Sequence, residues 1–197
     1  MDWIHILLAA GRSSRMGTPK QLLETPAGEN FISNWCEVAR QAGALKSYVV
    51  LGFHSARVKY CLEPFADNIE LVVNPNPAAD QTSSMKTALK TTGFDHPALM
   101  TLVDQPPLPR AVLEKILPSS TSGREKIRIP VFKSRRGHPP WFPTWFLKEI
   151  YNLGNDCGIN SLYSQYSEKI QTVKSDCSLV LKDIDRPADY QKYYERG

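Results

Sequence analysis

Short apolar runs and helical spacings alternate along the first half of the chain. Nearly continuous apolar runs are typical of strands buried on both faces, and they cover residues 3–9, 48–51, 69–73 and 98–103. Apolar residues three or four positions apart predict helices over residues 31–42, 58–65 and 83–89, with Ser83 or Ser84 as the N-cap of the third. This order predicts βαβ units and a three-layer α/β/α fold with a mostly parallel, Rossmann-like sheet.

The second half of the chain carries a less regular pattern. Helices are predicted over residues 110–117, 143–153 and 158–166 and again after Pro187, and strands over residues 127–132 and 179–184. The sequence contains no internal repeat, and 197 residues suit one domain that buries its own core. We therefore expect a single domain over residues 1–197.

Composition and charge narrow the classes of function. The chain has 24 Lys and Arg against 20 Asp and Glu, and its net charge of +4 is too small to indicate nucleic-acid binding. The apolar run at the N-terminus is too short for a membrane helix and follows an acidic residue, unlike a signal peptide. The four cysteines lack C-x-x-C spacing. We expect a cytoplasmic protein with no nucleic-acid or membrane partner and a small anionic substrate.

A polar loop of small and basic residues follows the first predicted strand. It reads LAAGRSSRMGTPK over residues 8–20 and carries the cations Arg12, Arg15 and Lys20. Ligands bind beyond the carboxyl ends of parallel strands, and small residues let backbone N–H groups approach a phosphate closely. The loop is neither a Walker A motif nor G-x-G-x-x-G. It is predicted to surround a triphosphate, and a solvated basic turn is the alternative.

Acidic residues occupy two places that suit metal binding. Asp104 follows the fourth predicted strand in LVDQPP, where a carboxylate can hold Mg²⁺ against phosphate oxygens or simply cap a turn. Asp183 and Asp185 stand two residues apart at the end of the last predicted strand, so we expect them to point to the same side. Pro187 and Asp189 suit the start of a helix, which is the alternative explanation of this segment.

The densest basic cluster reads RRGHPP over residues 135–140, with Lys133 close by. It suits a second anionic molecule, and a solvated loop is the alternative. His138 titrates near neutrality, which suits a general base, although a lone histidine is more often structural.

The run LAAGRSSRMGTPKQLL resembles the signature loop of the MobA-like nucleotidyltransferases. It is most similar to the molybdenum cofactor cytidylyltransferase group, and the resemblance extends over residues 4–190 through five motifs in the same order. It implies a fold of the nucleotide-diphospho-sugar transferase type. It also implies a nucleotide-binding half over about residues 1–104 and an acceptor-binding half over about residues 105–197.

The resemblance implies roles for individual residues. Catalytic roles fall to Arg15, Lys20 and Asp104, of which the two cations hold the phosphates. Asp104 and Asp185 are implied to bind Mg²⁺. The implied nucleotide-binding residues are Leu8, Ala9, Ala10, Gly11, Arg12, Ser13, Arg15, Lys20 and Ser84. The implied acceptor-binding residues are Gln105, Arg136, His138 and Asp156.

The chain departs from the family pattern at three places. Asp80 and Gln81 stand where Gly and Met are usual, beside the expected nucleobase, and an Asp there adds charge and removes backbone freedom. Asn160 replaces an Arg and so removes one contact to an anion. Arg186 and Ala188 stand where Thr and Glu are usual. These departures leave the substrate preference open.

The activity implied by the resemblance is transfer of CMP from CTP to the phosphate of a molybdopterin acceptor, with release of pyrophosphate. CTP is favoured because the loop reads L-A-A-G, whereas the related guanylyltransferases usually read L-A-G-G, and the methyl group of Ala10 narrows the space beside the base. Lys20 is expected in a solvent-facing loop. Two alternatives stay open: a nucleotidyltransferase that uses GTP or a sugar or alcohol phosphate, and a non-catalytic chaperone that carries the cofactor to a molybdoenzyme.

Overall fold

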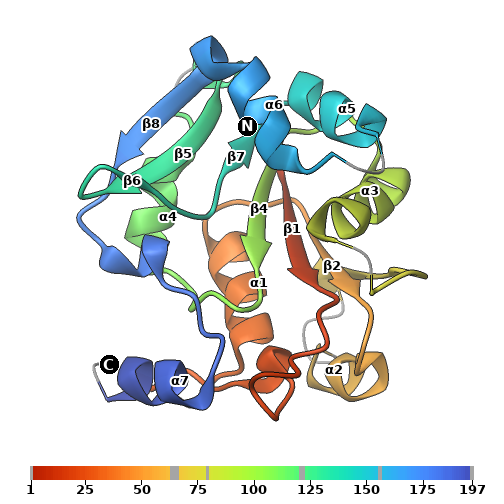
Figure 1. Ribbon diagram of the computed structural model, residues 1–197, viewed down its shortest axis with the longest axis vertical. Coiled ribbons are helices and arrows are strands. Elements are labelled where there is room, and N and C mark those ends of the chain that lie inside the picture. The colour runs from red at the N-terminus through yellow and green to blue at the C-terminus, as the bar shows by residue number, and fades with distance from the viewer. Residues whose placement is uncertain (1, 63–66, 79, 120–122, 155–156, 196–197) are drawn as a thin grey trace.

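A mixed β-sheet lies at the centre of the protein, with helices on both of its faces (Figure 1). The computed structural model describes residues 2–62, 67–78, 80–119, 123–154 and 157–195. Within these residues the strand order is β3-β2-β1-β4-β7-β5-β6, and β8 pairs with β5 outside this path. Because β1 and β4 are parallel neighbours, the loops that follow them meet at the same edge of the sheet.

The first four strands are parallel to one another. They are β1 (Ile4–Ala9), β2 (Ser47–Leu51), β3 (Ile69–Val73) and β4 (Ala98–Leu102). The later strands are β5 (Ile127–Phe132), β6 (Arg135–Arg136), β7 (Trp141–Phe142) and β8 (Ile170–Lys174). β7 runs antiparallel to β4 and β5, β6 runs antiparallel to β5, and β8 is parallel to β5. β1 is buried along its whole length, as an apolar strand covered on both faces must be.

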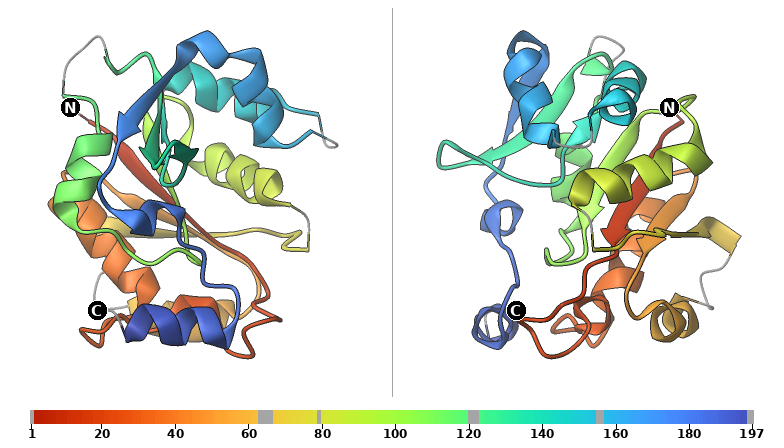
Figure 2. Two further views of the ribbon diagram at one scale, coloured as in Figure 1. Left: turned by 60° about the vertical axis from the view of Figure 1, so that its left-hand side comes forward. Right: turned by 45° about the vertical axis from the view of Figure 1, so that its right-hand side comes forward.

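The helices cover the two faces of the sheet in separate groups (Figure 2). One face packs against α1 (Phe31–Gln41), α2 (Ser55–Leu62) and α4 (Arg110–Ile116). The other packs against α3 (Gln81–Thr92), α5 (Thr144–Asn152) and α6 (Ile159–Gln165). The last helix, α7 (Pro187–Tyr194), lies beside the segment that follows β1, and short 3₁₀ turns form η1 (Lys20–Leu22), η4 (Ser167–Lys169) and η5 (Ser178–Leu181). None of the helices in the described ranges is long and apolar enough to cross a membrane.

The α/β/α fold and the parallel order of the first strands are confirmed, but two local predictions are wrong. The strand predicted over residues 179–184 is absent, because η5 occupies part of that segment and the strand β8 lies earlier. The N-cap of α3 is neither Ser83 nor Ser84. It is Asp80, whose carboxylate accepts a hydrogen bond from the backbone N–H of Ser83 at 2.9 Å.

His5 forms a buried polar bridge in the middle of the sheet. Its Nδ1 lies 2.9 Å from the hydroxyl of Ser47 on β2, and its Nε2 lies 2.7 Å from the hydroxyl of Thr101 on β4. Burial lowers the pKa of His5 from 6.5 to about 3, because a charged imidazole would lose its hydration there. The folded protein therefore keeps His5 neutral at pH values where the unfolded chain protonates it.

We expect the free energy of unfolding to fall as the pH drops from about 6.5 toward 4, by up to about 1.4 kcal/mol per pH unit from His5. The sign follows because the unfolded chain binds this proton and the folded protein does not. Urea unfolding at several pH values measures the slope. His5→Gln keeps a hydrogen-bond donor and acceptor but does not titrate, so it is expected to flatten the slope. A slope unchanged in this variant contradicts the assignment.

Candidate active site

The loop after β1 is held in place by its own side chains. Gln21 is fully buried, and its side-chain amide donates to the carbonyl oxygens of Ala9 and Gly11 at 2.7 and 3.4 Å. The backbone N–H of Lys20 donates to the hydroxyl of Ser13 at 3.0 Å. These bonds tie the two ends of the loop together, so that its cations project from a fixed backbone.

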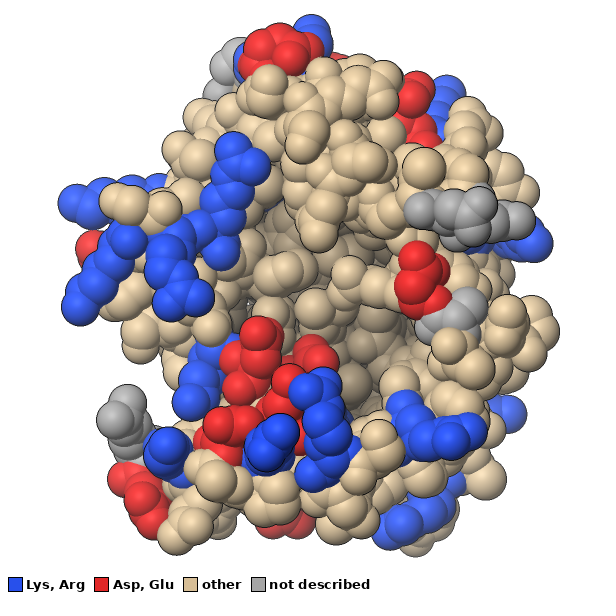
Figure 3. Space-filling view, in the orientation of Figure 1, with Lys and Arg blue, Asp and Glu red and all other residues tan. Residues whose placement is uncertain are grey.

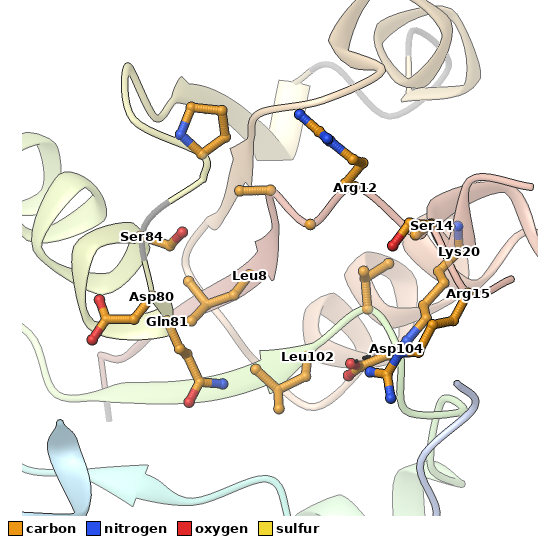
Figure 4. Close-up of a pocket in the computed structure, with 15 residues that line it drawn as sticks. Leu8, Arg12, Ser14, Arg15, Lys20, Asp80, Gln81, Ser84, Leu102 and Asp104 are labelled. Atoms are coloured by element: carbon orange, nitrogen blue, oxygen red, sulfur yellow. Dashed lines mark hydrogen bonds and ion pairs between the residues drawn. The ribbon is translucent and has the colours of Figure 1, made fainter. Parts of the chain in front are cut away.

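A cleft of about 360 Å³ opens between this loop, β4 and the start of α3 (Figure 4). Its charged end holds Arg15, Lys20 and Asp104, and its other end is formed by the first turn of α3. The residues that line it are Leu8, Ala10, Gly11, Arg12, Ser13, Ser14, Arg15, Lys20, Pro77, Asp80, Gln81, Ser84, Leu102, Val103 and Asp104. Of the implied nucleotide-binding residues, only Ala9 lies outside this lining, because its side chain packs into the core.

Lys20 is the centre of an ion-pair cluster at the charged end of the cleft. Its Nζ lies 2.6 Å from Oδ1 of Asp185 and 3.5 Å from Oδ2 of Asp104. Arg15 reaches the same oxygen of Asp185 at 3.1 Å. The side chain of Lys20 is only 10% exposed, whereas that of Arg15 is 63% exposed. The expectation of a solvent-facing Lys20 is therefore wrong, since two carboxylates from later in the chain enclose it.

The two carboxylates in this cluster have opposite shifts in pKa. Burial raises the pKa of Asp104, with Lys20 opposing the shift and the carboxylates of Asp183 and Asp185 adding to it. The hydrogen bond from Lys20 is the main cause that lowers the pKa of Asp185. Asp104 is thus the less compensated anion, and its Oδ1 is buried without a hydrogen-bond partner among the described residues.

Two contacts hold the C-terminal segment against this loop. The backbone N–H of Ile184 donates to the carbonyl oxygen of Asp104 at 2.7 Å, and the Ile184 side chain is buried in a small apolar cluster with Met16. On α7, the hydroxyl of Tyr190 donates to the carbonyl oxygen of Glu24 at 3.0 Å and accepts from its N–H at 3.3 Å. The segment is therefore fixed to the loop after β1 and to the turn after β4.

The residues of this cluster fit a magnesium ion that is bound together with phosphate. Mg²⁺ usually takes one or two carboxylates and completes its shell with substrate phosphates and water. Asp104 and Asp185 supply the carboxylates, and the buried Oδ1 of Asp104 is an acceptor without a partner in the described part of the chain. The described residues contain no group of three or more His, Cys, Asp or Glu arranged to hold a metal. This donor set does not form an all-protein metal site.

A second cavity of about 550 Å³ brings together Arg136, His138 and, from α6, Asn160 and Tyr163. Burial lowers the pKa of His138, and its Nδ1 is a buried atom with no hydrogen-bond partner in the described ranges. The cavity therefore offers one cation, a neutral imidazole, an amide and a phenol, which suits a ligand that combines an anionic group with ring donors and acceptors.

One residue implied to bind the acceptor, Gln105, does not line this second cavity. The side-chain amide of Gln105 donates to Oδ1 of Asp183 at 3.0 Å, and the backbone carbonyl oxygen of Gln105 accepts from the indole N–H of Trp35. Gln105 therefore positions Asp183. The charge of Asp183 adds to the raised pKa of Asp104 and opposes the lowered pKa of His138.

Figure 3 shows acidic side chains at the lower margin of a central hollow, with basic ones beside them and a further basic group over β6. Asp156 lies outside the described residues.

Asp80 was identified from the sequence, but Pro77 in the cleft and the buried Gln21 were not. Asp80 has a φ of −76°, so the position does not require glycine, and the expected loss of backbone freedom has no consequence here. Gly52 leaves room for both Pro77 and Ala10: a Cβ on Gly52 would overlap Pro77 and lie 2.7 Å from the Ala10 carbonyl oxygen. Gly52, which follows β2, was the sequence feature that could have indicated this close approach. The burial of Gln21 had no such indication, because the residues next to a polar residue in the sequence do not predict that it is buried.

β1 and β4 are neighbouring parallel strands of the mixed sheet, with a basic loop after β1 and a carboxylate after β4. This arrangement suits an α/β domain that binds a nucleotide. The chain belongs to the MobA-like NTP transferase family, whose model matches residues 5–170.

Several relatives and solved structures are similar to this chain. A protein from Rhodopirellula baltica named probable molybdenum cofactor guanylyltransferase is 35% identical over 108 residues, which is 53% of this chain and 49% of that protein. Nicotine blue oxidoreductase from Paenarthrobacter nicotinovorans is 28% identical over 68% of this chain and 67% of its own length. The crystal structure of Rv0371c from Mycobacterium tuberculosis is 27% identical with a TM-score of 0.80 over 98% of both chains. A structure of its complex with manganese is 25% identical with a TM-score of 0.78 over 100% of both chains.

Proposed function

We propose that this protein transfers CMP from CTP to the phosphate of a molybdopterin-type acceptor and releases pyrophosphate. The observation that carries the proposal is the ion-pair cluster of Lys20 with Asp104 and Asp185 beside the loop after β1. It combines, at one end of a cleft, the cations that a triphosphate needs and the carboxylates that its metal needs. The family and the guanylyltransferase name of a relative support this class of reaction and acceptor.

The chemistry is an in-line displacement at the α-phosphorus of the nucleotide. An oxygen of the acceptor phosphate forms the new bond, and the bond to the β-phosphate breaks. The nucleophile is already an anion, so positioning and charge neutralisation suffice and no strong general base is needed. Arg15 and Lys20 would neutralise the departing pyrophosphate. Mg²⁺ held by Asp104 and Asp185 would neutralise phosphate oxygens.

The choice of CTP rests on Ala10, whose side chain lines the cleft. We expect Ala10→Gly to lower the ratio of CTP affinity to GTP affinity about ten-fold, because the lost methyl group makes room for a purine. Calorimetric titration of each nucleotide with Mg²⁺ measures the ratio. Ala9→Gly is the matched control, since the Ala9 side chain packs into the core and not into the cleft. Equal ratios in the two variants would show that Ala10 does not select the base.

GTP is the second candidate nucleotide, because the 35% identical relative is named a guanylyltransferase. If the wild-type protein binds GTP more tightly than CTP in the same titrations, the base assignment is overturned and the transfer chemistry is not.

The acceptor is tested by the release of pyrophosphate. The second cavity, with Arg136 and His138, suits a phosphate attached to a ring that forms hydrogen bonds. Release that requires molybdopterin supports the proposal, and release only with sugar or alcohol phosphates supports a different transferase. Nucleotide binding without release for any acceptor would indicate a non-catalytic carrier of the cofactor for a molybdoenzyme.

A further inference from the structure

The ammonium group of Lys20 lies between the two carboxylates that the proposed function assigns to the metal. Its Nζ contacts Oδ1 of Asp185 at 2.6 Å and faces Oδ2 of Asp104 at 3.5 Å. The guanidinium of Arg15 also forms an ion pair with this Oδ1 of Asp185, at 3.1 Å. A divalent cation that binds these two residues must therefore share their oxygens with a lysine.

The position of Lys20 is fixed by the structure around it. Its backbone N–H is bound to Ser13, and the next residue, Gln21, is fully buried and bonded to the carbonyls of Ala9 and Gly11. The Lys20 side chain is 10% exposed, and a buried ammonium group is costly unless carboxylates accompany it. The ammonium group of Lys20 is therefore expected to remain paired with Asp104 and Asp185 when no other anion is near.

The charges around the cluster are balanced without a metal. The ion pairs join two carboxylates, those of Asp104 and Asp185, to two cations, Lys20 and Arg15. A divalent cation approaching this centre alone gains little net attraction, whereas a triphosphate brings several negative charges that can take over Lys20 and Arg15.

We propose that Lys20 competes with the divalent cation for Asp104 and Asp185, so that the site binds metal tightly only together with a nucleoside triphosphate. The inference rests on the proposed function, because it assigns the phosphates as the alternative partners of Lys20. It makes Lys20 a regulator of metal entry as well as a ligand of the phosphates.

The test is calorimetric titration of Mn²⁺ into the full chain without nucleotide. Lys20→Met is expected to bind Mn²⁺ at least about ten-fold more tightly than the wild type, because it removes the competing charge and keeps the length of the side chain. Lys20→Gln is expected to change the affinity in the same direction. Lys90→Met, on α3 and outside the cleft, is the matched control and should leave it unchanged.

A second substitution shows where the metal binds. The double variant Lys20→Met, Asp104→Asn is expected to lose the gain in affinity, since it lacks one of the two carboxylates. The competition is overturned if neither Lys20 variant, each folded by circular dichroism, binds Mn²⁺ more tightly than the wild type. It is also overturned if the gain persists in the double variant.

Titration of Mn²⁺ in the presence of CTP separates this inference from the proposed function. If the wild type binds no nucleotide but Lys20→Met still gains affinity, the competition for the carboxylates stands, and both the proposed function and the role of phosphate fail. If CTP promotes Mn²⁺ binding in the wild type but Lys20→Met shows no gain without it, the proposed function stands and the competition fails.

Discussion

Replacing Lys20 with methionine is expected to lower the rate of nucleotidyl transfer by about 10³-fold. The ammonium group lies at the charged end of the cleft, between Asp104 and Asp185, where the phosphates that leave as pyrophosphate are expected. A cation held in a fixed, mostly buried place stabilises the charge of a transition state more than mobile water does. Pyrophosphate release at saturating CTP measures the loss.

Arg15→Met is the matched comparison for this variant. The Arg15 side chain is 63% exposed and contacts only one of the two carboxylates, so water and salt screen its charge more strongly. We expect its loss of rate to be at least ten-fold smaller than that of Lys20→Met. Thermal unfolding of both variants distinguishes a lost cation from a lost fold. Turnover by a folded Lys20→Met protein within ten-fold of the wild type would be incompatible with its assigned role.

Asp104→Asn is expected to reduce the rate by about 10²- to 10³-fold. The amide has nearly the same shape but no charge, and its nitrogen cannot coordinate Mg²⁺ in place of a carboxylate oxygen. A single-turnover assay with saturating CTP and Mg²⁺ measures the loss.

Asp183→Asn is the control for this prediction. Asp183 is near Asp104 but its Oδ1 accepts a hydrogen bond from Gln105, so it is not assigned to the metal. Its replacement is expected to cost much less activity than Asp104→Asn. Equal losses in the two variants would mean that the acidic charge of the region matters and that Asp104 has no special role.

The parallel core is predictable because β1 and β4 are apolar runs in which His5 and Thr101 are the polar exceptions. A strand covered on both faces needs an apolar side chain at nearly every position, and that requirement is visible in the sequence. β8 does not meet it, since it lies at the edge of the sheet and none of its residues is fully buried. An edge strand of mixed polarity has no pattern that distinguishes it from a loop.

The candidate site is predictable only in part. Lys20 and Asp104 follow neighbouring parallel strands, so their proximity follows from the order of the sheet. The alternation of a strand was the wrong reason to place Asp183 beside Asp185, because no strand forms there. The burial of Lys20 depends on Asp185, which is held in place by the packing of Ile184. Such burial results from tertiary contacts that leave no local pattern.

The separation of Lys20 and Asp185 along the chain has a consequence for biosynthesis. The two residues are 165 positions apart. A ribosome adds roughly 5–20 residues per second, so about 10 to 30 seconds pass between their translation. Throughout that interval the nascent protein carries its basic loop without Asp185, the carboxylate that contacts both Lys20 and Arg15 in the finished protein. Newly made chains are therefore expected to attract polyanions, including the ribosomal RNA around them, more strongly than the finished protein does.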